Sequence, residues 1–477
     1  MKDYKALSDI QEDLNKGIIT CEKLVNKYLE KISKETSLNA FLETFDESAK
    51  LQARLIDEKL LNNSAGKLAG MVIGIKDNIV YKGHKVSASS KMLENFESLF
   101  SATVVERLLA EDAIIIGRLN CDEFAMGSST ENSAFGVTKN AANQAYVPGG
   151  SSGGSAVAVQ AGLCLASLGS DTGGSIRQPA SYCGIVGVKP TYGRVSRNGL
   201  IAFASSFDQI GPFTHTVEDA ALLTEIISGH DRMDSTTSNA EVPSFSQSIL
   251  KSDSSKKYKI AYIKDCLDHL GLNEEVRLAV TSKIEELKSD GHIVEPISFP
   301  FLDYMVPAYY VLTTAEASSN LARYDGVHFG YRSPNAKNLE ETYVFSRSEG
   351  FGAEVKRRIM LGTYVLSAGY YDAYYAKAQK VRRVLRDKTN EIFSDFDFIL
   401  SPTTTNSAFK IGQKSNDPIE MYLEDIFTVQ ANLVGSPAIS IPLGKTANNM
   451  PFGLQLMAKA FDEKNLFNFS ATLMNKQ

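Results

Sequence analysis

The sequence predicts an α/β fold, built as a single large domain whose central β-sheet is flanked by helices on both faces. From residue 68 onward, short apolar runs alternate with stretches of helical periodicity, the pattern of a sheet buried on both sides. The 477 residues are 43% hydrophobic and 22% charged, an ordinary balance for a globular chain with a large core. No internal repeat or low-complexity tract divides the chain, so we expect one domain over residues 1–477.

A helical N-terminal segment is expected over residues 1–62, before the main sheet begins. Thr20 is placed to cap a helix, because its side-chain oxygen can accept a hydrogen bond from a free amide of the first turn. A strand over residues 38–45 and a second helix over residues 47–61 complete this segment. Several apolar residues after Thr20 share one face of the first helix: Leu24, Val25, Tyr28, Leu29 and Ile32.

In the main body, the expected elements alternate along the chain. We expect helices at residues 102–111, 155–163, 273–290 and 369–393. Residues 228–257 are polar, rich in Ser, Asp and Thr, and lack periodicity, so they predict a polar surface excursion within the domain. We expect strands at residues 71–75, 113–117, 164–168, 258–263, 292–297, 396–400, 438–442 and 453–457.

The composition argues against several classes of function. The net charge is −6 and the basic residues are spread along the chain, so direct tight binding of RNA or DNA is not expected. The five cysteines form no CxxC pair and the six histidines have no metal-binding spacing, which favours buried, reduced thiols over a metal site. The N-terminus is charged, and the longest weakly polar run, residues 156–169, is too short to span a bilayer. We therefore expect a cytoplasmic protein without a membrane segment.

Three short strings carry the candidate chemistry: GIKDN at residues 74–78, GGSSGGS at 149–155 and GSDTGGSIR at 169–177. Lys76 follows an apolar strand, and the sites of α/β proteins lie at the carboxyl ends of strands. A serine attacks an amide only when a base takes its proton, and a lysine that burial keeps neutral can be that base. Taken alone, Lys76 is more often a solvated surface lysine. On composition alone residues 149–155 could be a flexible linker, but they lie between Pro148 and an Ala/Val helix rather than between domains.

The third string offers a row of backbone amides. The N–H groups of Thr172, Gly173, Gly174 and Ser175 can converge on a negative oxygen, which is either a tetrahedral oxyanion or a phosphate. Nucleotide binding is the weaker alternative, because the chain has no GxxxxGK[ST] and no GxGxxG after a strand.

The three strings resemble the amidase signature family, whose members cleave amides with a Ser–Ser–Lys triad. The resemblance covers nearly the whole chain and weakens around residues 228–257 and at the extreme C-terminus. It implies the amidase signature fold, with a central mixed β-sheet. Further similar motifs are DEFAMG at 122–127, KPTYGRVS at 189–196, SSFDQIGP at 205–212, EASSNL at 316–321, SRSEGFG at 346–352 and GYYDAYY at 369–375.

The family pattern is intact at each triad position and implies a role for each residue. Ser175 would be the nucleophile, Ser151 the bridging serine and Lys76 the neutral base. In the family a cis peptide bond joins Ser151 to the preceding residue, here Gly150. The oxyanion would be held by the backbone amides of three residues: Thr172, Gly173 and Gly174.

The resemblance also points to residues that would hold the substrate, glutamine. Free glutamine is a zwitterion, so a buried site must pair both of its charges. Arg358 would bind the α-carboxylate and Asp425 the α-ammonium, with Tyr309 nearby. Without the family, Arg358 and Asp425 would be interpreted as charges on helix surfaces.

Within the family, the motifs are similar to members that hydrolyse glutamine as the A subunit of a heterotrimeric amidotransferase. There, ammonia passes to the B subunit, which uses ATP and Mg to activate the glutamate of a misacylated tRNA, and the C subunit is a small structural partner. The resemblance thus implies no cofactor and no metal in this chain, with tRNA reached mainly through the B subunit. Two alternatives stay open: a free-standing amidase of small molecules, and an inert amidase fold that binds or scaffolds.

Overall fold

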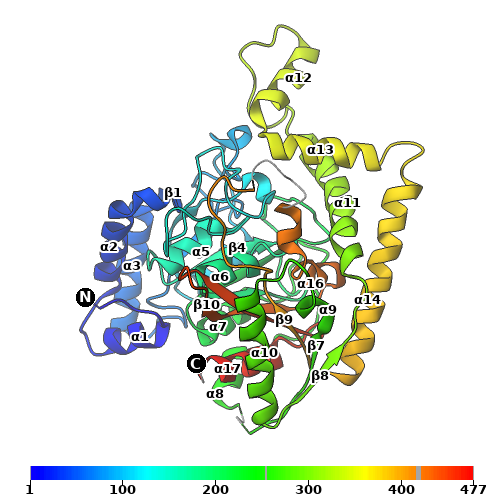
Figure 1. Cartoon of the computed structure of the whole chain (residues 1–477). Helices are drawn as coiled ribbons and strands as arrows, with labels where there is room; N and C mark the ends of the chain where they lie inside the picture. The colour runs from blue at the N-terminus through cyan, green and yellow to red at the C-terminus, as the bar shows by residue number, and fades with distance from the viewer. Residues whose placement is uncertain (1, 253–254, 415–420, 476–477) are drawn as a thin grey trace.

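The computed structural model describes residues 2–252, 255–414 and 421–475. Its centre is one sheet of eleven strands, ordered β1-β3-β2-β4-β6-β5-β10-β11-β9-β7-β8 (Figure 1). The strands are β1 (Phe41–Thr44), β2 (Val72–Lys76), β3 (Ile114–Leu119), β4 (Ala166–Asp171), β5 (Val186–Lys189), β6 (Gln209–Thr214), β7 (Lys259–Ile263), β8 (Ile293–Ile297), β9 (Phe398–Pro402), β10 (Ala438–Lys445) and β11 (Pro451–Ala458).

The sheet is mixed, as expected. β2 runs parallel to its neighbours β3 and β4, and β7 runs parallel to β8 and β9. The strands between these two groups pair antiparallel with one another and with β4 and β9. Every residue of β2, β3 and β4 is buried, so this part of the sheet is covered on both faces and the expected fold class is confirmed.

Two groups of helices pack on the sheet. The bounds are α1 (Leu7–Asn15), α2 (Cys21–Lys34), α3 (Asp46–Leu61), α4 (Thr103–Ala110), α5 (Gly153–Gln160), α6 (Arg177–Cys183), α7 (Val217–Ile227), α8 (Phe245–Leu250), α9 (Lys264–Leu267), α10 (Glu274–Ser289), α11 (Leu302–Asn320), α12 (Leu339–Gly350), α13 (Ala353–Val365), α14 (Lys377–Asp395), α16 (Val429–Val434) and α17 (Glu463–Met474). α5 and α6 contact each other and strands from β2 to β11, while α7, α8 and α17 form a second group. Figure 1 shows α1–α3 on one flank, α11, α13 and α14 on the other, and α12 projecting from the body.

The N-terminal segment folds largely as predicted. The Thr20 side chain accepts a hydrogen bond from the Lys23 amide at 3.2 Å and so caps α2. The apolar face of α2 is buried, except that Leu29 is only half-buried. The strand expected over 38–45 is shorter, because Leu38 ends a 3₁₀ turn and Asn39 has a φ of +50°, which reverses the chain before β1.

The polar excursion expected over residues 228–257 is more structured than its sequence indicates. It contains α8, and the Phe245 ring of that helix is fully buried, 5.5 Å from the ring of Phe467 in α17. One aromatic side chain thus fixes a mostly polar segment to the body. Residues 253–254 of the predicted range lie outside the described residues. The helix expected over 369–393 begins as a π turn (Asp372–Ala376) and continues as α14.

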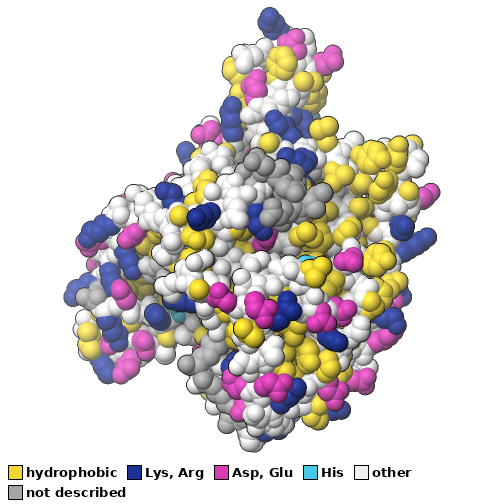
Figure 2. Space-filling view, in the orientation of Figure 1, with side chains coloured by type: hydrophobic (Ala, Val, Ile, Leu, Met, Phe, Trp, Pro, Cys, Tyr) yellow, Lys and Arg dark blue, Asp and Glu magenta, His cyan; other side chains and the backbone are white. Residues whose placement is uncertain are grey.

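Apolar side chains gather at the corner where α13 meets α14, on the upper right of Figure 2. Exposed patches of this kind are typical of protein–protein contacts. Across the described ranges, no helix is both long and apolar enough to cross a membrane. The exposed residues at the corner are Met360, Leu361, Tyr364, Tyr370, Tyr371 and Tyr374.

Candidate active site

Lys76 ends β2 and is fully buried. Its Nζ lies 2.8 Å from the Oγ of Ser151 and 2.9 Å from the Oγ of both Ser152 and Ser170. Burial lowers the pKa of Lys76 to about 8, although the surrounding acidic groups oppose the shift. A substantial fraction of this amine is therefore neutral near physiological pH and has a lone pair to accept a proton.

The hydrogen bonds around Lys76 are compatible with Ser151 as the proton donor to that lone pair. The Ser152 hydroxyl already donates to the Ser170 carbonyl at 3.1 Å, so Ser152 accepts from Lys76. The Ser170 Oγ accepts from the Asn78 amide at 3.0 Å as well as from Lys76. A neutral amine has two N–H donors, which these two acceptors use, and the remaining hydroxyl belongs to Ser151.

The turn that carries Ser151 is held by backbone contacts. The peptide bond between Gly150 and Ser151 is cis, as the family resemblance implied. The Ser151 carbonyl accepts from the Asp122 amide at 3.0 Å, and the Gly150 amide donates to the Gln178 side chain at 2.9 Å. A Cβ on Gly150 would lie 2.2 Å from the Asp122 carboxylate and 2.6 Å from the Ser129 amide, so only glycine fits there.

Ser175 lies directly beside this turn. Its carbonyl accepts a hydrogen bond from the Ser152 amide at 3.3 Å. Its hydroxyl makes no hydrogen bond to any part of the chain that the structure describes, and the residue is 8% exposed. Of the expected relay, the Lys76–Ser151 link is formed, whereas Ser151 and Ser175 are not hydrogen-bonded to each other. Catalytic hydrogen bonds are often formed only when substrate is bound.

The loop from Thr172 to Ser175 is braced by a buried ion pair that the sequence reasoning did not identify. Arg177 binds both oxygens of Asp171, at 3.0 and 3.1 Å, and both side chains are fully buried. Burial alone would raise the pKa of Asp171, but Arg177 and Asn432 hold it at about 2. The remaining Arg177 donors bind the carbonyl of Thr428 and the side chains of Gln455 and Asn432.

Within that loop, the amide N–H groups of Thr172, Gly173 and Gly174 donate to no acceptor in the described chain. They are the free donors that an oxyanion next to Ser175 needs. Gly174 has a φ of +143°, a conformation that favours glycine. The loop is fixed from outside, because the Thr428 hydroxyl donates to the Gly173 carbonyl at 2.7 Å.

Two of the three expected substrate residues lie against this loop. A Cβ on Gly173 would lie 2.6 Å from the hydroxyl of Tyr309 on α11, and one on Gly174 would lie 3.3 Å from Asp425 Oδ1. Asp425 is buried at the end of a 3₁₀ turn (Leu423–Asp425) and accepts a hydrogen bond from the Ser128 hydroxyl at 2.8 Å. Burial raises the pKa of Asp425 to about 7, so this carboxylate favours a cation beside it.

Arg358, the third expected substrate residue, lies on α13 and is 3% exposed. Three aromatic rings, those of Phe203, Tyr310 and Tyr422, surround its guanidinium at 5.2–5.6 Å. Burial lowers the pKa of Arg358, but the fields of Tyr310 and Glu354 raise it above its usual value. Glu354, which the sequence reasoning missed, accepts from Arg358 Nε at 2.8 Å and orients the guanidinium.

Several supporting residues were therefore not predicted. Ser152, Ser170 and Asp171 lie inside the two serine-containing strings, so their position was a usable signal. Thr428 and Glu354 come from distant segments without any local motif, and only the fold brings them to the site. Within the described ranges, no cluster of three or more His, Cys, Asp or Glu side chains is arranged to hold a metal ion. All five cysteines are buried free thiols.

Comparison with known proteins gives consistent results. The Amidase family profile matches residues 23–467. The A subunit of Glutamyl-tRNA(Gln) amidotransferase from Chlorobium phaeobacteroides is 51% identical over 473 residues, 99% of each chain. The corresponding protein from Bacillus cytotoxicus, which bears the same name, is 52% identical over 463 residues, 97% of this chain and 95% of the relative.

Solved structures agree with these sequence relationships. The crystal structure of the A subunit of Glutamyl-tRNA(Gln) amidotransferase from Thermotoga maritima has 43% identity and a TM-score of 0.76, covering 94% of this chain and 90% of that one. A peptide amidase from Stenotrophomonas maltophilia has 27% identity and a TM-score of 0.81, covering 98% and 96%. With the Lys76–Ser151 pair and the free amides beside Ser175, these similarities show that the chain belongs to the amidase family.

Proposed function

We propose that this chain is the glutaminase subunit of a glutamyl-tRNA(Gln) amidotransferase. The observation that carries the proposal is the pairing of opposite buried charges next to the serine loop, with Asp425 against Gly174 and Arg358 on the neighbouring helix. A zwitterionic amino acid amide matches both charges, because its ammonium would pair with Asp425 and its carboxylate with the part of the Arg358 guanidinium that Glu354 does not hold, whereas a simple amide offers neither charge. The near-complete match to relatives that bear this subunit name supports the same substrate.

In the proposed reaction, Lys76 is the base and Ser151 carries the proton. Ser175 Oγ attacks the side-chain carbonyl carbon of glutamine while its proton moves to Ser151, whose own proton moves to Lys76. The negative oxygen of the tetrahedral intermediate accepts hydrogen bonds from the loop amides, and losing one such donor typically costs about 10²–10³ in rate. When the C–N bond breaks, the relay returns the proton to the leaving nitrogen, which departs as ammonia.

The acyl-enzyme is then hydrolysed by the same groups. A water molecule attacks the ester carbonyl, and its proton passes through the relay to Ser175 as the ester bond breaks. Glutamate is released and the hydroxyl of Ser175 is restored. The chain's part of the reaction therefore needs no metal or cofactor; ATP and Mg would be used by the partner that activates the tRNA-bound glutamate.

The partners in this proposal are the B and C subunits, which with this chain form a heterotrimer in the cytoplasm. The B subunit would activate the glutamate of misacylated tRNA and receive the ammonia, and tRNA would contact mainly that partner. The net charge of −6 and the absence of a P-loop sequence support placing RNA and ATP on the partner. The exposed aromatic corner between α13 and α14 supports a chain that works in a complex.

The experiment that tests this function uses the assembled complex with misacylated tRNA. Ser175→Ala should abolish amidation with glutamine as the nitrogen source and leave amidation with added ammonia intact. Loss of both activities would show that the chain is not the glutaminase. A free-standing amidase, the alternative, would instead hydrolyse simple amides without either partner.

A further inference from the structure

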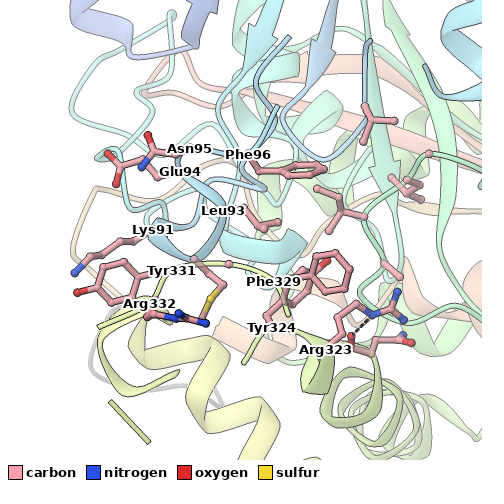
Figure 3. Close-up of a pocket in the computed structure, with 18 of the residues that line it drawn as sticks. Lys91, Leu93, Glu94, Asn95, Phe96, Arg323, Tyr324, Phe329, Tyr331 and Arg332 are labelled. Atoms are coloured by element: carbon pink, nitrogen blue, oxygen red, sulfur yellow. Dashed lines mark hydrogen bonds between the residues drawn. The ribbon is translucent and has the colours of Figure 1, made fainter. Parts of the chain in front are cut away.

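A groove of about 720 Å³ opens in the surface, and none of its lining residues belongs to the Lys76 or Asp425 clusters. We call it the basic–aromatic groove. Figure 3 shows Lys91 and Tyr331 at one end and Arg323 at the other, with Tyr324 and Phe329 between them. Three segments far apart in sequence form its walls: residues 91–100, 199–202 and 320–332.

The groove is preformed. The Tyr331 amide donates to the Met92 carbonyl at 2.7 Å and joins two of the walls. Gly330 has a φ of +85°, and a Cβ there would lie 2.5 Å from the Met92 sulfur, too close for any side chain. The segment that carries Gly330 therefore packs directly against the segment that carries Met92. Met92 and Leu93 form a buried apolar base. The groove therefore exists before anything binds in it.

Apolar side chains line the groove yet remain exposed. Phe329 is 56% exposed, Phe100 50% and Phe96 40%. Covering these exposed rings with a second apolar surface would lower the free energy, because apolar area is removed from water. Buried anchor residues of this kind contribute most of the binding energy of protein interfaces.

The charge of the groove is one-sided. Lys91, Arg323 and Arg332 are all exposed or half-exposed, and none forms an ion pair within the described residues. Lys91 Nζ lies 4.2 Å from the Tyr331 ring centroid. The two arginines donate to backbone carbonyls, Arg323 Nε to Asn320 at 3.0 Å and Arg332 Nε to Gly326 at 2.6 Å. Among the described residues that line the groove, Glu94 is the only carboxylate. In the described chain none of the three cations has a carboxylate within ion-pair distance, although the pKa of the Glu349 carboxyl is lowered by the Tyr331 hydroxyl and also by the nearby charge of Lys91; on a chain of net charge −6, such a cluster favours an anionic occupant.

We propose that the basic–aromatic groove binds an acidic segment of a partner protein of the complex, with one apolar side chain inserted between Phe96 and Phe329. Carboxylates on that segment would pair with Lys91 and Arg332 at one end of the groove and with Arg323 at the other. The inference rests on the proposed function, which requires partner chains. It goes beyond that function because it assigns a docking surface and the chemistry of the segment that covers it.

The observations favour this occupant over the alternatives. Three cations around an apolar base provide few phosphate contacts, so RNA is a weaker match. A small anion would pair with one end of the groove and leave the rings uncovered. A second copy would have to place an acidic segment of its own in the groove. Each chain would then carry both the groove and the segment that fills it, and such head-to-tail contacts form open chains unless they close into a ring.

The test uses the chain co-expressed with the B and C subunits. The double variant Arg323→Glu with Arg332→Glu should reduce recovery of the partners at least tenfold, with wild-type binding weakening as salt rises. The matched control is Lys251→Glu with Lys464→Glu, two exposed lysines that give the same change in net charge. The control should assemble like wild type. Circular dichroism of each variant checks that it folds.

A second measurement does not depend on folding of a charge variant. A photo-crosslinking amino acid at Phe329 should attach to an acidic peptide of one of the two partners, identified by mass spectrometry, whereas one at the fully exposed Leu270 should not. Crosslinks to tRNA or only to a second copy, or normal assembly of the double variant, would overturn the inference and leave the proposed function standing. Failure of the wild-type chain to bind either partner would overturn both.

Discussion

The pH dependence of glutamine hydrolysis tests the two most perturbed groups of the site together. Lys76 acts as a base only when neutral, and with a pKa lowered by burial to about 8 it is roughly half neutral at pH 8 and about one-tenth neutral at pH 7. Asp425 binds the α-ammonium only when ionised, and with a pKa raised by burial to about 7 it loses that charge as the pH falls through 7.

These two ionisations predict different profiles for kcat/KM and kcat. Since kcat/KM needs both groups in the free enzyme, it should fall about tenfold between pH 8 and 7 and about fiftyfold between pH 7 and 6. A bound ammonium keeps Asp425 ionised, so kcat should depend on Lys76 alone and fall about fivefold over the first step and about ninefold over the second.

The assay is release of glutamate by the assembled complex, measured from pH 6 to 8 at saturating and at low glutamine. Ammonia-dependent amidation by the same complex, at a fixed concentration of unprotonated ammonia, is the control, because it bypasses Ser175 and reports any effect of pH on the partners. A kcat that stays flat from pH 6 to 8 would refute Lys76 as the titrating base. Identical slopes for kcat and kcat/KM would refute the role of Asp425.

Three further predictions concern the buried contacts. Thr428→Val leaves the Gly173 carbonyl unpaired, so it should lower the free energy of unfolding by about 1–3 kcal/mol and lower kcat more than it raises KM. Thr428→Ser keeps the hydroxyl and should restore both the stability and the kinetics. Unchanged kinetics in Thr428→Val would exclude the positioning role. Lys76→Met should abolish hydrolysis yet raise the free energy of unfolding at pH 7 by up to about 3 kcal/mol, because burial in the folded protein lowers the pKa of Lys76 from 10.5 to about 8. For the same reason the stability of the wild-type protein should rise between pH 8 and 10.5. A variant that is no more stable than wild type in urea unfolding would contradict this reasoning. Arg177→Met strands the buried Asp171 carboxylate and should destabilise the protein by about 3–5 kcal/mol in the same measurement, whereas a loss below about 1 kcal/mol would show that the ion pair does not brace the loop.

Much of the sheet could be predicted because its strands are apolar runs of local sequence. The strand expected at 71–75 is β2, displaced by one residue, and the one expected at 164–168 is β4, displaced by two or three. The strands β5 and β6 were not predicted: β5 is a four-residue apolar run interrupted by Gly187, too short to give a clear pattern, and β6 contains Gly211 and Pro212. The buried ring of Phe245 shows what the prediction for residues 228–257 left out: one aromatic contact with α17 fixes the segment and gives no periodic signal.

The sequence by itself determined the chemistry available to this protein: a lysine at the end of an apolar strand, two serines in glycine-rich strings and a row of amides free to turn toward an oxygen. Those features are local, because glycine and the strand pattern act over a few residues. Only the tertiary structure decided that Lys76 is dry enough to lose its proton, that Ser152 and Ser170 occupy its donors, and that Thr428 and Glu354 hold the loop and the arginine. Burial and long-range hydrogen bonds depend on how segments hundreds of residues apart pack together, and no local pattern encodes that packing.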